Sequence, residues 1–370
     1  MRARWIVLFA VFALAGEVLA CSTPVFRYAI ERWEADPYRL MVFTDGELTE
    51  DQQQVVKKFK RYERYGFQVP PLIVDQVETS TATNLSAKVW SEISTHRTAP
   101  AVALLYPKIM RDTSVVWTDD LSTNALNRIV MSPARIETAS RLLGGDAAVW
   151  LMIRGDDSEE NQRVREVLEA AHRKIENSTV YNDDFLKLVE EAGGEAPELR
   201  FSVLEVDRND PREAVLMAML MNLSSEAAEH SGPLVIPIFG QGRAAVIMMK
   251  EFIAEEYIER VAEFLTGACS CEVKSLNPGF DVLIPIDWVG GITEEYVFDA
   301  KLPPLTSPSA ALEPIPEPEI ARVDERIEEL EKSEIRLFGG ILGVFLLAAL
   351  GALGFVTWLM VRKDHNHDAV

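Results

Sequence analysis

The sequence predicts an α/β protein with two similar halves, followed by a single membrane-spanning helix. Within residues 38–265, apolar runs of strand length alternate with segments whose apolar side chains recur every three to four positions, and this order occurs twice. Residues 337–361 then form an apolar stretch without charged side chains, long enough to cross about 30 Å of hydrocarbon. We therefore expect two folded domains that are held at a membrane by their C-terminal side.

The two ends of the chain agree on its orientation. Two arginines, the apolar run 5–15 and small residues up to Ala20 form the pattern of a secretory signal. The pair Arg362-Lys363 directly follows the predicted span and favours the cytoplasmic side. The ectodomain is therefore predicted on the extracytoplasmic side of a membrane, and the compact signal and short tail favour a bacterial cell envelope.

Cleavage after Ala20 makes Cys21 the first residue of the mature chain. A cysteine at this position can carry a lipid, or it can be an ordinary first residue. Glu17 favours the second interpretation, because a charge four residues before the cysteine fits poorly in a lipoprotein signal.

Composition excludes some classes of function. The formal charge of −21 argues against a nucleic-acid partner, because an acidic surface repels phosphate. Three cysteines are too few for a disulfide framework, so packing must supply most of the stability. His96, His172 and His230 lie far apart in sequence and lack the spacing of metal ligands. We expect no cofactor, and the chain shows no catalytic constellation.

The first half begins with a predicted strand at residues 38–43 and a helix whose Thr49 and Gln52 fit a capping box. The elements predicted after it are a strand at 72–77, a helix at 86–93, strands at 101–106 and 114–118, and a helix at 122–130.

The second half repeats this order more clearly. Ser158 is the predicted cap of its first helix, and Asp210-Pro211 opens an apolar helix that runs through Met221. The strands are predicted at 147–153, 201–206, 234–239 and 244–249, a further helical stretch at 185–191, and the last helix at 255–265.

The order of strand, helix, strand, helix, hairpin and final helix resembles the thioredoxin-like fold. A proline enters the hairpin in both halves, in Ala99-Pro100-Ala101-Val102 and in Gly232-Pro233-Leu234-Val235. In thioredoxin-like proteins this proline is typically cis and faces the active site, so the resemblance implies cis peptide bonds at Pro100 and Pro233. The fold class is thus α/β, with two tandem thioredoxin-like domains, a Pro-rich stalk and one C-terminal transmembrane helix.

These elements set the predicted domain boundaries. They are a signal peptide at 1–20, thioredoxin-like domains at 21–145 and 146–300, a Pro-rich linker at 301–318, a juxtamembrane helix at 319–336, the transmembrane helix at 337–361 and a cytoplasmic tail at 362–370. The juxtamembrane helix is either a lone helix or a homodimer contact, because its apolar residues have coiled-coil spacing at Ile320, Val323, Ile327 and Leu330.

Both halves depart from the redox-active members of that family. Those members carry two cysteines between the first strand and the first helix, where the helix N-terminus stabilises a thiolate. The corresponding loops here, Thr44-Asp45-Gly46-Glu47-Leu48 and Arg154-Gly155-Asp156-Asp157-Ser158, contain no thiol. Thioredoxin-type disulfide exchange at these loops is therefore excluded, and their acidic residues suit helix caps.

Cys269 and Cys271 form a C-x-C directly after the last predicted helix. Three interpretations stay open: a disulfide from Cys21 to one of them, a disulfide between the two, or a soft metal such as Cu(I) bound by thiolates. An oxidising compartment favours the structural disulfide to Cys21.

Two functions follow from these observations. The first is a membrane-anchored binding or scaffold protein with redox-inactive domains, whose partner is another envelope protein. The alternative is a thiol–disulfide or copper-handling protein that uses Cys269 and Cys271. The absence of a catalytic constellation favours the first, which is not an enzyme.

Overall fold

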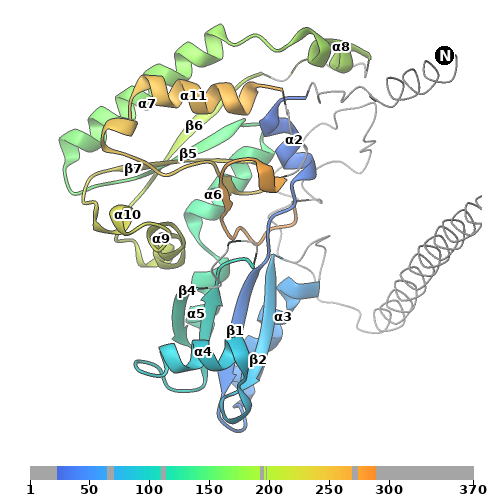
Figure 1. Cartoon of the computed structure of the whole chain (residues 1–370), viewed down its shortest axis with the longest axis vertical. Coiled ribbons are helices and arrows are strands. Elements are labelled where there is room, and N and C mark those ends of the chain that lie inside the picture. The colour runs from blue at the N-terminus through green and yellow to red at the C-terminus, as the bar shows by residue number, and fades with distance from the viewer. Residues whose placement is uncertain are drawn as a thin grey trace, which may run out of the picture. The chain divides into compact units, whose positions relative to one another are not determined.

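The computed structural model describes residues 23–64, 71–108, 110, 114–191, 196, 198–268 and 274–288 (Figure 1). Both sheets belong to one compact unit. No helix in this described part is long and apolar enough to cross a membrane, and the span predicted at 337–361 lies outside it. The predicted signal, stalk and juxtamembrane helix also lie outside the described residues, as do all three cysteines.

The first half is a mixed sheet of four strands in the order β2-β1-β3-β4. β1 runs parallel to β2 and antiparallel to β3, and β4 runs antiparallel to β3. The element order is the predicted one, and Thr49 and Gln52 form the predicted capping box with N···O distances of 3.0 and 3.3 Å. The elements are β1 (Tyr38–Thr44), α3 (Glu50–Arg64), β2 (Leu72–Glu78), α4 (Asn84–Ile93), β3 (Ala101–Leu105), β4 (Val115–Asp120) and α5 (Thr123–Val130).

The second half is a mixed sheet in the order β10-β8-β7-β5-β6, with β9 also paired to β7. β5 again runs parallel to the next strand, β6, and antiparallel to β7. The elements are β5 (Ala148–Ile153), α7 (Ser158–Ser178), α8 (Asp183–Glu191), β6 (Phe201–Val206), α9 (Ala214–Met221), α10 (Ser225–Glu229), β7 (Leu234–Phe239), β8 (Arg243–Ala244), β9 (Met248–Met249), α11 (Glu255–Thr266) and β10 (Phe280–Asp281).

The strand that returns after β7 is divided into β8 and β9, whereas the sequence predicts one strand at 244–249. β8 pairs with the end of β7, at Ile238 and Phe239, and β9 pairs with its start. Pro237 lies between these two pairings and has no N–H to donate, although its carbonyl oxygen accepts a 2.9 Å hydrogen bond from Ala245. The ladder is therefore broken where the proline interrupts it.

Strand β5 shows why the second sheet has helices on both faces. Trp150 and Met152 point into an apolar cluster with α7 and α11, whereas Val149, Leu151 and Ile153 belong to the cluster that contains α9. All six residues of β5 are buried, as expected for a strand whose alternating side chains are covered on both sides. Figure 1 shows α7 and α11 on one side of this sheet and α6 and α9 on the other.

Two further helices, neither of them predicted from the sequence, cover the second sheet. α6 (Pro133–Leu143) packs against β5 and β6, and α2 (Val25–Arg32) packs against α11 and β7 (Figure 1). Gly240 in the hairpin turn adopts φ +57°, and a Cβ atom there would lie 2.8 Å from Cβ of Ala29 on α2. Both helices therefore pack on the second sheet, although they precede residue 146 in the sequence.

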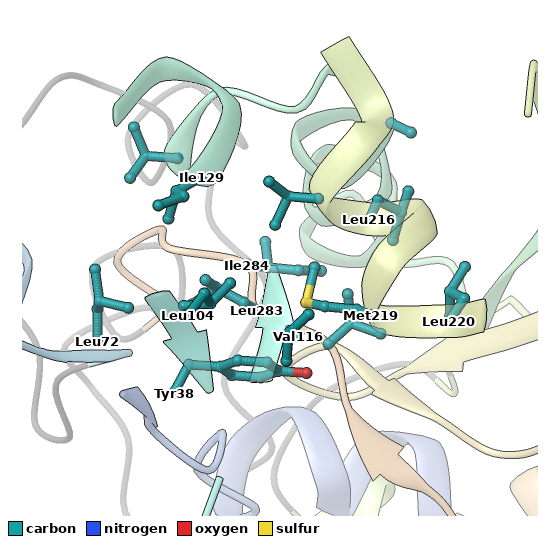
Figure 2. Close-up of a cluster of buried hydrophobic side chains, with 14 of the residues drawn as sticks. Tyr38, Leu72, Leu104, Val116, Ile129, Leu216, Met219, Leu220, Leu283 and Ile284 are labelled. Carbon is teal, nitrogen blue, oxygen red and sulfur yellow. The ribbon is translucent and has the colours of Figure 1, made fainter. Parts of the chain in front are cut away.

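The two sheets share one apolar core. Figure 2 shows Tyr38, Leu104 and Val116 of the first half near Met219 and Leu220 of α9, with further side chains of a segment after β10 among them. We call this contact between the two halves the joint. Two hydrogen bonds cross it: the Tyr106 hydroxyl donates to the Met219 carbonyl at 2.7 Å, and the side-chain amide of Asn222 donates to the Val116 carbonyl at 2.9 Å. The halves are therefore joined by apolar packing and by side chains that satisfy buried main-chain carbonyl groups.

Glu213 forms a buried polar contact at this joint. It precedes α9 in the second half, and its carboxylate accepts hydrogen bonds from the Ser132 hydroxyl and, at 2.7 Å, from the amide of Ala134. The Ser132 hydroxyl in turn accepts a 3.1 Å bond from the amide of Arg135. Glu213 thus caps the N-terminus of α6 together with Ser132, where the helix dipole favours a negative charge.

Arg135 is the buried cation of the joint. Its guanidinium donates to the carbonyl oxygens of Arg128 at 3.0 Å and Ile129 at 2.7 Å in the last turn of α5, and to that of Leu283 at 2.5 Å. Burial lowers the pKa of Arg135 below its ordinary value, to about 10, and the nearby Glu213 carboxylate opposes this shift. The side chain therefore stays charged at neutral pH and binds two other segments from its place on α6, the last turn of α5 and the main chain at Leu283.

We expect Glu213→Ala to lower the free energy of unfolding by about 2–4 kcal/mol, because two donors lose their acceptor and Arg135 loses the nearby negative charge. Urea denaturation of the two proteins measures the difference. The matched control is Glu229→Ala at an exposed position of α10. Equal losses in the two variants would show that the cap does not contribute to the joint.

Candidate functional site: the loops after β1 and β5

In each half, the loop after the first strand and the turn before the hairpin meet at one edge of the sheet. β1 and β3 are antiparallel, and Phe43 near the end of β1 pairs with Ala101 at the start of β3. The equivalent pair in the second half is Ile153 with Leu234. The topology therefore brings each thiol-free loop close to the proline that precedes the third strand.

In the first half, this loop is open to solvent. The Glu78 carboxylate at the end of β2 fixes its start, accepting hydrogen bonds from the Thr44 hydroxyl at 2.9 Å and the Gly46 amide at 3.0 Å. Gly46 has φ +83°, and a Cβ atom added there would have no atom within 4 Å. Asp45 and Glu47 on either side of it are exposed. The loop is thus fixed at one end and accessible at its tip.

In the second half, the equivalent loop is closed. A Cβ atom on Gly155 would lie 2.5 Å from the carbonyl carbon of Gly232, so only glycine fits. The Asn161 side chain binds both main-chain groups of Gly155, at 2.8 Å to its amide and 2.9 Å to its carbonyl. The Asp156 amide also donates to the Ser231 carbonyl at 3.0 Å. Direct main-chain contact therefore fills the position that is open in the first half.

The prolines before the third strands, Pro100 and Pro233, also differ between the two halves. The Ala99–Pro100 peptide bond is cis, and it is the only cis bond among the described residues, so the expectation of a cis bond at Pro233 is wrong. Residues 230–232 are held from two sides before they enter β7. Arg208 donates to the carbonyl oxygens of His230 and, at 2.9 Å, Gly232, while Gly155 packs against Gly232. These contacts hold the main chain in the path that leads into β7 through a trans bond.

Acidic residues near these loops serve as helix caps. Asp157, not the predicted Ser158, is the N-cap of α7, and it accepts bonds of 2.8 and 3.3 Å from the amides of Glu159 and Glu160. Asp210 likewise accepts from the Arg212 amide at 2.9 Å. Their carboxylates are thus engaged by main-chain N–H groups at helix N-termini.

The histidines lie in three separate environments. His96 is exposed, His230 lies against Gly232, and His172 is buried between Trp150 and Phe201, at ring-centroid distances of 4.9 and 5.4 Å. Desolvation lowers the pKa of His172 from 6.5 to about 4. Within the described residues, no group of three His, Cys, Asp or Glu side chains is placed to hold a metal ion.

Residues that flank the cysteines are paired, although the cysteines themselves lie outside the described part. Pro24 and Ala268 form an isolated antiparallel bridge, and the Val25 amide donates to the Gly267 carbonyl at 3.0 Å. The sequence analysis missed α2, which makes this contact, although apolar residues at helical spacing could have indicated it: Val25, Phe26, Ala29, Ile30 and Trp33. The start of α2 therefore lies beside the end of α11.

No family model and no curated protein matches the sequence. Among solved structures, the chain is similar to the zinc-bound form of human ERp44, with 10% identity and a TM-score of 0.18, over 65% of this chain and 58% of that one. It is also similar to the first two thioredoxin domains of Saccharomyces cerevisiae Eps1p, with 11% identity and a TM-score of 0.20, over 64% of this chain and 94% of that one. The chain thus spans 58% of the ERp44 chain. The strand order of the two sheets is a mixed α/β arrangement compatible with a thioredoxin-like fold.

We predict that His172 makes stability depend on pH. Its folded-state pKa is depressed to about 4, so the unfolded chain takes up this proton first as the pH falls from about 6.5. The contribution is complete above pH 6.5 and is lost towards pH 4, by at most about 3 kcal/mol. Urea denaturation of wild type and His172→Gln between pH 4 and 7 should show a shallower pH slope in the variant. The control His96→Gln, at an exposed position, should keep the wild-type slope, and an unchanged slope in His172→Gln would contradict the prediction.

Proposed function

We propose that the protein is a membrane-anchored extracytoplasmic binding or scaffold protein with two redox-inactive thioredoxin-like domains. The observation that carries this proposal is the difference between the two equivalent loops. Gly46 in the first half has free space around it, whereas Gly155 in the second half is in main-chain contact with Gly232. Only the first loop can therefore accept a partner without a rearrangement of the main chain.

The residue types at the two loops support a binding role over a redox role. Neither loop contains a cysteine, so the nucleophile of disulfide exchange is missing at both positions. Glu78, Asp157 and Asn161 instead hold the main chain of their loops through hydrogen bonds. Groups used in this way position the loops and have no free role in proton transfer.

The charge of the first loop indicates the chemistry of the partner. Asp45 and Glu47 are exposed and have no ion pair among the described residues. Arg97 lies 3.6 Å from Asp119 and 3.4 Å from Asp120, so its charge is balanced by other acids. An acidic tip of this kind favours a basic segment of another envelope protein, because complementary charge speeds the encounter and rejects like-charged partners.

The membrane anchor is part of the proposal and rests on sequence features outside the described residues. The signal pattern, the uncharged stretch 337–361 and Arg362-Lys363 agree on one orientation. The Pro-rich residues 301–318 would hold the ectodomain away from the bilayer as a semi-rigid spacer. The coiled-coil spacing at Ile320, Val323, Ile327 and Leu330 supports pairing of two chains near the membrane.

A capture experiment tests the proposed function. The bait is the ectodomain that ends at Arg336, which should be released from membranes while the full chain sediments with them. We expect Asp45→Lys with Glu47→Lys to reduce capture of the envelope partner at least tenfold, because charge reversal replaces attraction by repulsion. The matched control is Asp156→Lys in the closed loop of the second half, which should capture as wild type does. Equal capture by all three baits would contradict a binding surface at the first loop.

The alternative function, thiol or copper handling by Cys269 and Cys271, competes with a structural disulfide. The bridge between Pro24 and Ala268 favours the disulfide. Cys21 precedes Pro24 by three residues and Cys271 follows Ala268 by three, and an antiparallel pairing sets residues at equal offsets opposite each other. We therefore propose a Cys21–Cys271 bond, in which two thiols give two protons and two electrons to a disulfide oxidant of the compartment.

We predict that Cys271→Ser lowers the melting temperature under oxidising conditions and that a reductant lowers that of wild type similarly. The bond would close a loop of about 250 residues, for which chain entropy allows up to roughly 5 kcal/mol, less any strain. Differential scanning calorimetry measures the change, and thiol titration should find one free thiol in the oxidised wild type. Cys269→Ser is the matched control and should melt as wild type does. Unchanged melting in Cys271→Ser and in reductant would favour metal or redox chemistry at these thiols.

A further inference from the structure

The last described segment of the chain, residues 281–288, lies between the two halves; we call it the strap. Its apolar side chains are buried at the joint and belong to the shared core: Val282, Leu283, Ile284, Ile286 and Trp288. Figure 2 shows Leu283 and Ile284 among side chains of both halves, near Leu104 and Met219. The strap therefore fills the space that the two halves would otherwise have to close by direct contact.

Polar bonds fix the start of the strap to both halves. The buried Asp281 carboxylate lies 3.0 Å from the Arg243 guanidinium and also accepts from the Lys274 ammonium. The Asp281 carbonyl accepts a 2.9 Å bond from the hydroxyl of Tyr38, and its carboxylate accepts a 2.6 Å bond from the amide of Asp36. Asp281 thus ties strand β8 of the second half to the segment that enters β1.

The rest of the strap is held by side chains more than by a strand ladder. β10 pairs with β8 only at Phe280 and Asp281. The Val282 amide then donates to the Gly242 carbonyl at 2.9 Å, and within the described residues no later main-chain bond joins the strap to the second sheet. Beyond it, Leu283 accepts the bond from Arg135 through its carbonyl oxygen. Such a segment can leave the joint without breaking a run of sheet hydrogen bonds.

The chain that follows Trp288 continues to the proposed stalk and membrane helix. A pull from that side would act on Trp288 first and then on Ile286 and Ile284, so the strap would be peeled off residue by residue. Its loss would remove an acceptor from Arg135 and a partner from Tyr38, both of which lie outside the second sheet. We propose that the strap can detach from the joint under force. Its release by a pull on the following chain uncouples the two halves before either sheet unfolds. The uncoupling does not depend on the proposed membrane anchor; only the origin of the pull does.

Single-molecule stretching tests the order of events. One handle is attached at Val180, which is exposed in the second half, and the other at Lys301, beyond the strap. We expect a first extension step of about 28 Å, the reach of roughly eight extended residues, before a larger step from the sheets. A single large step with no earlier extension would overturn the proposal.

Two matched leucines test the role of side-chain burial. Leu283→Asp places a charge in the joint, whereas the control Leu276→Asp changes a leucine that is 73% exposed and precedes the strap. We expect Leu283→Asp to remove the first step and to speed amide exchange in α9 and β4 at least tenfold, while β5 stays protected. Leu276→Asp should match wild type in both measurements.

A milder substitution tests the strap if the Leu283→Asp protein does not fold. Ile284→Ala leaves a cavity without a buried charge and should lower the force of the first step while the second step keeps its force. An equal drop in both forces, or joint amides that exchange only together with β5, would show that the two halves and the strap unfold as one unit and would overturn the proposal.

Discussion

The joint between the two halves depends on one buried cation, Arg135. A guanidinium removed from water is costly unless its donors and its charge are satisfied. Here the partners come from three parts of the chain: carbonyl oxygens at the end of α5, the carbonyl of Leu283 and the nearby carboxylate of Glu213. Helices α5 and α6, the strap and the segment before α9 must therefore be in place together, which makes their mutual position a condition of burying this charge.

The same joint explains why two halves with one element order have different surfaces. In the second half, α2 covers one side of β7 near the hairpin turn, and the contact between Gly155 and Gly232 closes the loop after β5. In the first half, α9 and the strap cover the inner side of the sheet, while the loop at Gly46 remains accessible. The loop after the first strand is thus accessible in the first half and closed by main-chain packing in the second.

Local sequence patterns predicted most elements because their causes lie within a few residues. The capping box of Thr49 and Gln52, the apolar run of β5 and the proline that opens the segment before α9 each act over one or two turns. Errors occurred where an adjacent residue took the predicted role or where a residue on a paired strand interrupted a predicted element. Asp157 caps α7 in place of Ser158, and Pro237 divides the returning strand of the hairpin.

The sequence predicted the position of the candidate site, the loops after β1 and β5, but not the environment of each loop. The two thiol-free loops and the prolines Pro100 and Pro233 follow from the order of elements, but their environments depend on residues far away in the chain. Gly232 closes against Gly155 across the sheet, and Arg208 reaches the carbonyl oxygens that precede Pro233. Nothing in the local pattern of either loop encodes these contacts, so the open and closed states could not be distinguished beforehand.

By itself, the sequence determined the α/β class, the order of elements in both halves and the absence of a thiol from either loop, since periodicity and residue chemistry are local properties. Only the tertiary structure decided that α2 and α6 belong to the second sheet, that Pro233 follows a trans bond and that the strap joins the halves. The physical reason is that buried charges and apolar faces are satisfied by whichever segments reach them in space, and Arg135 finds Leu283 through folding of the whole chain.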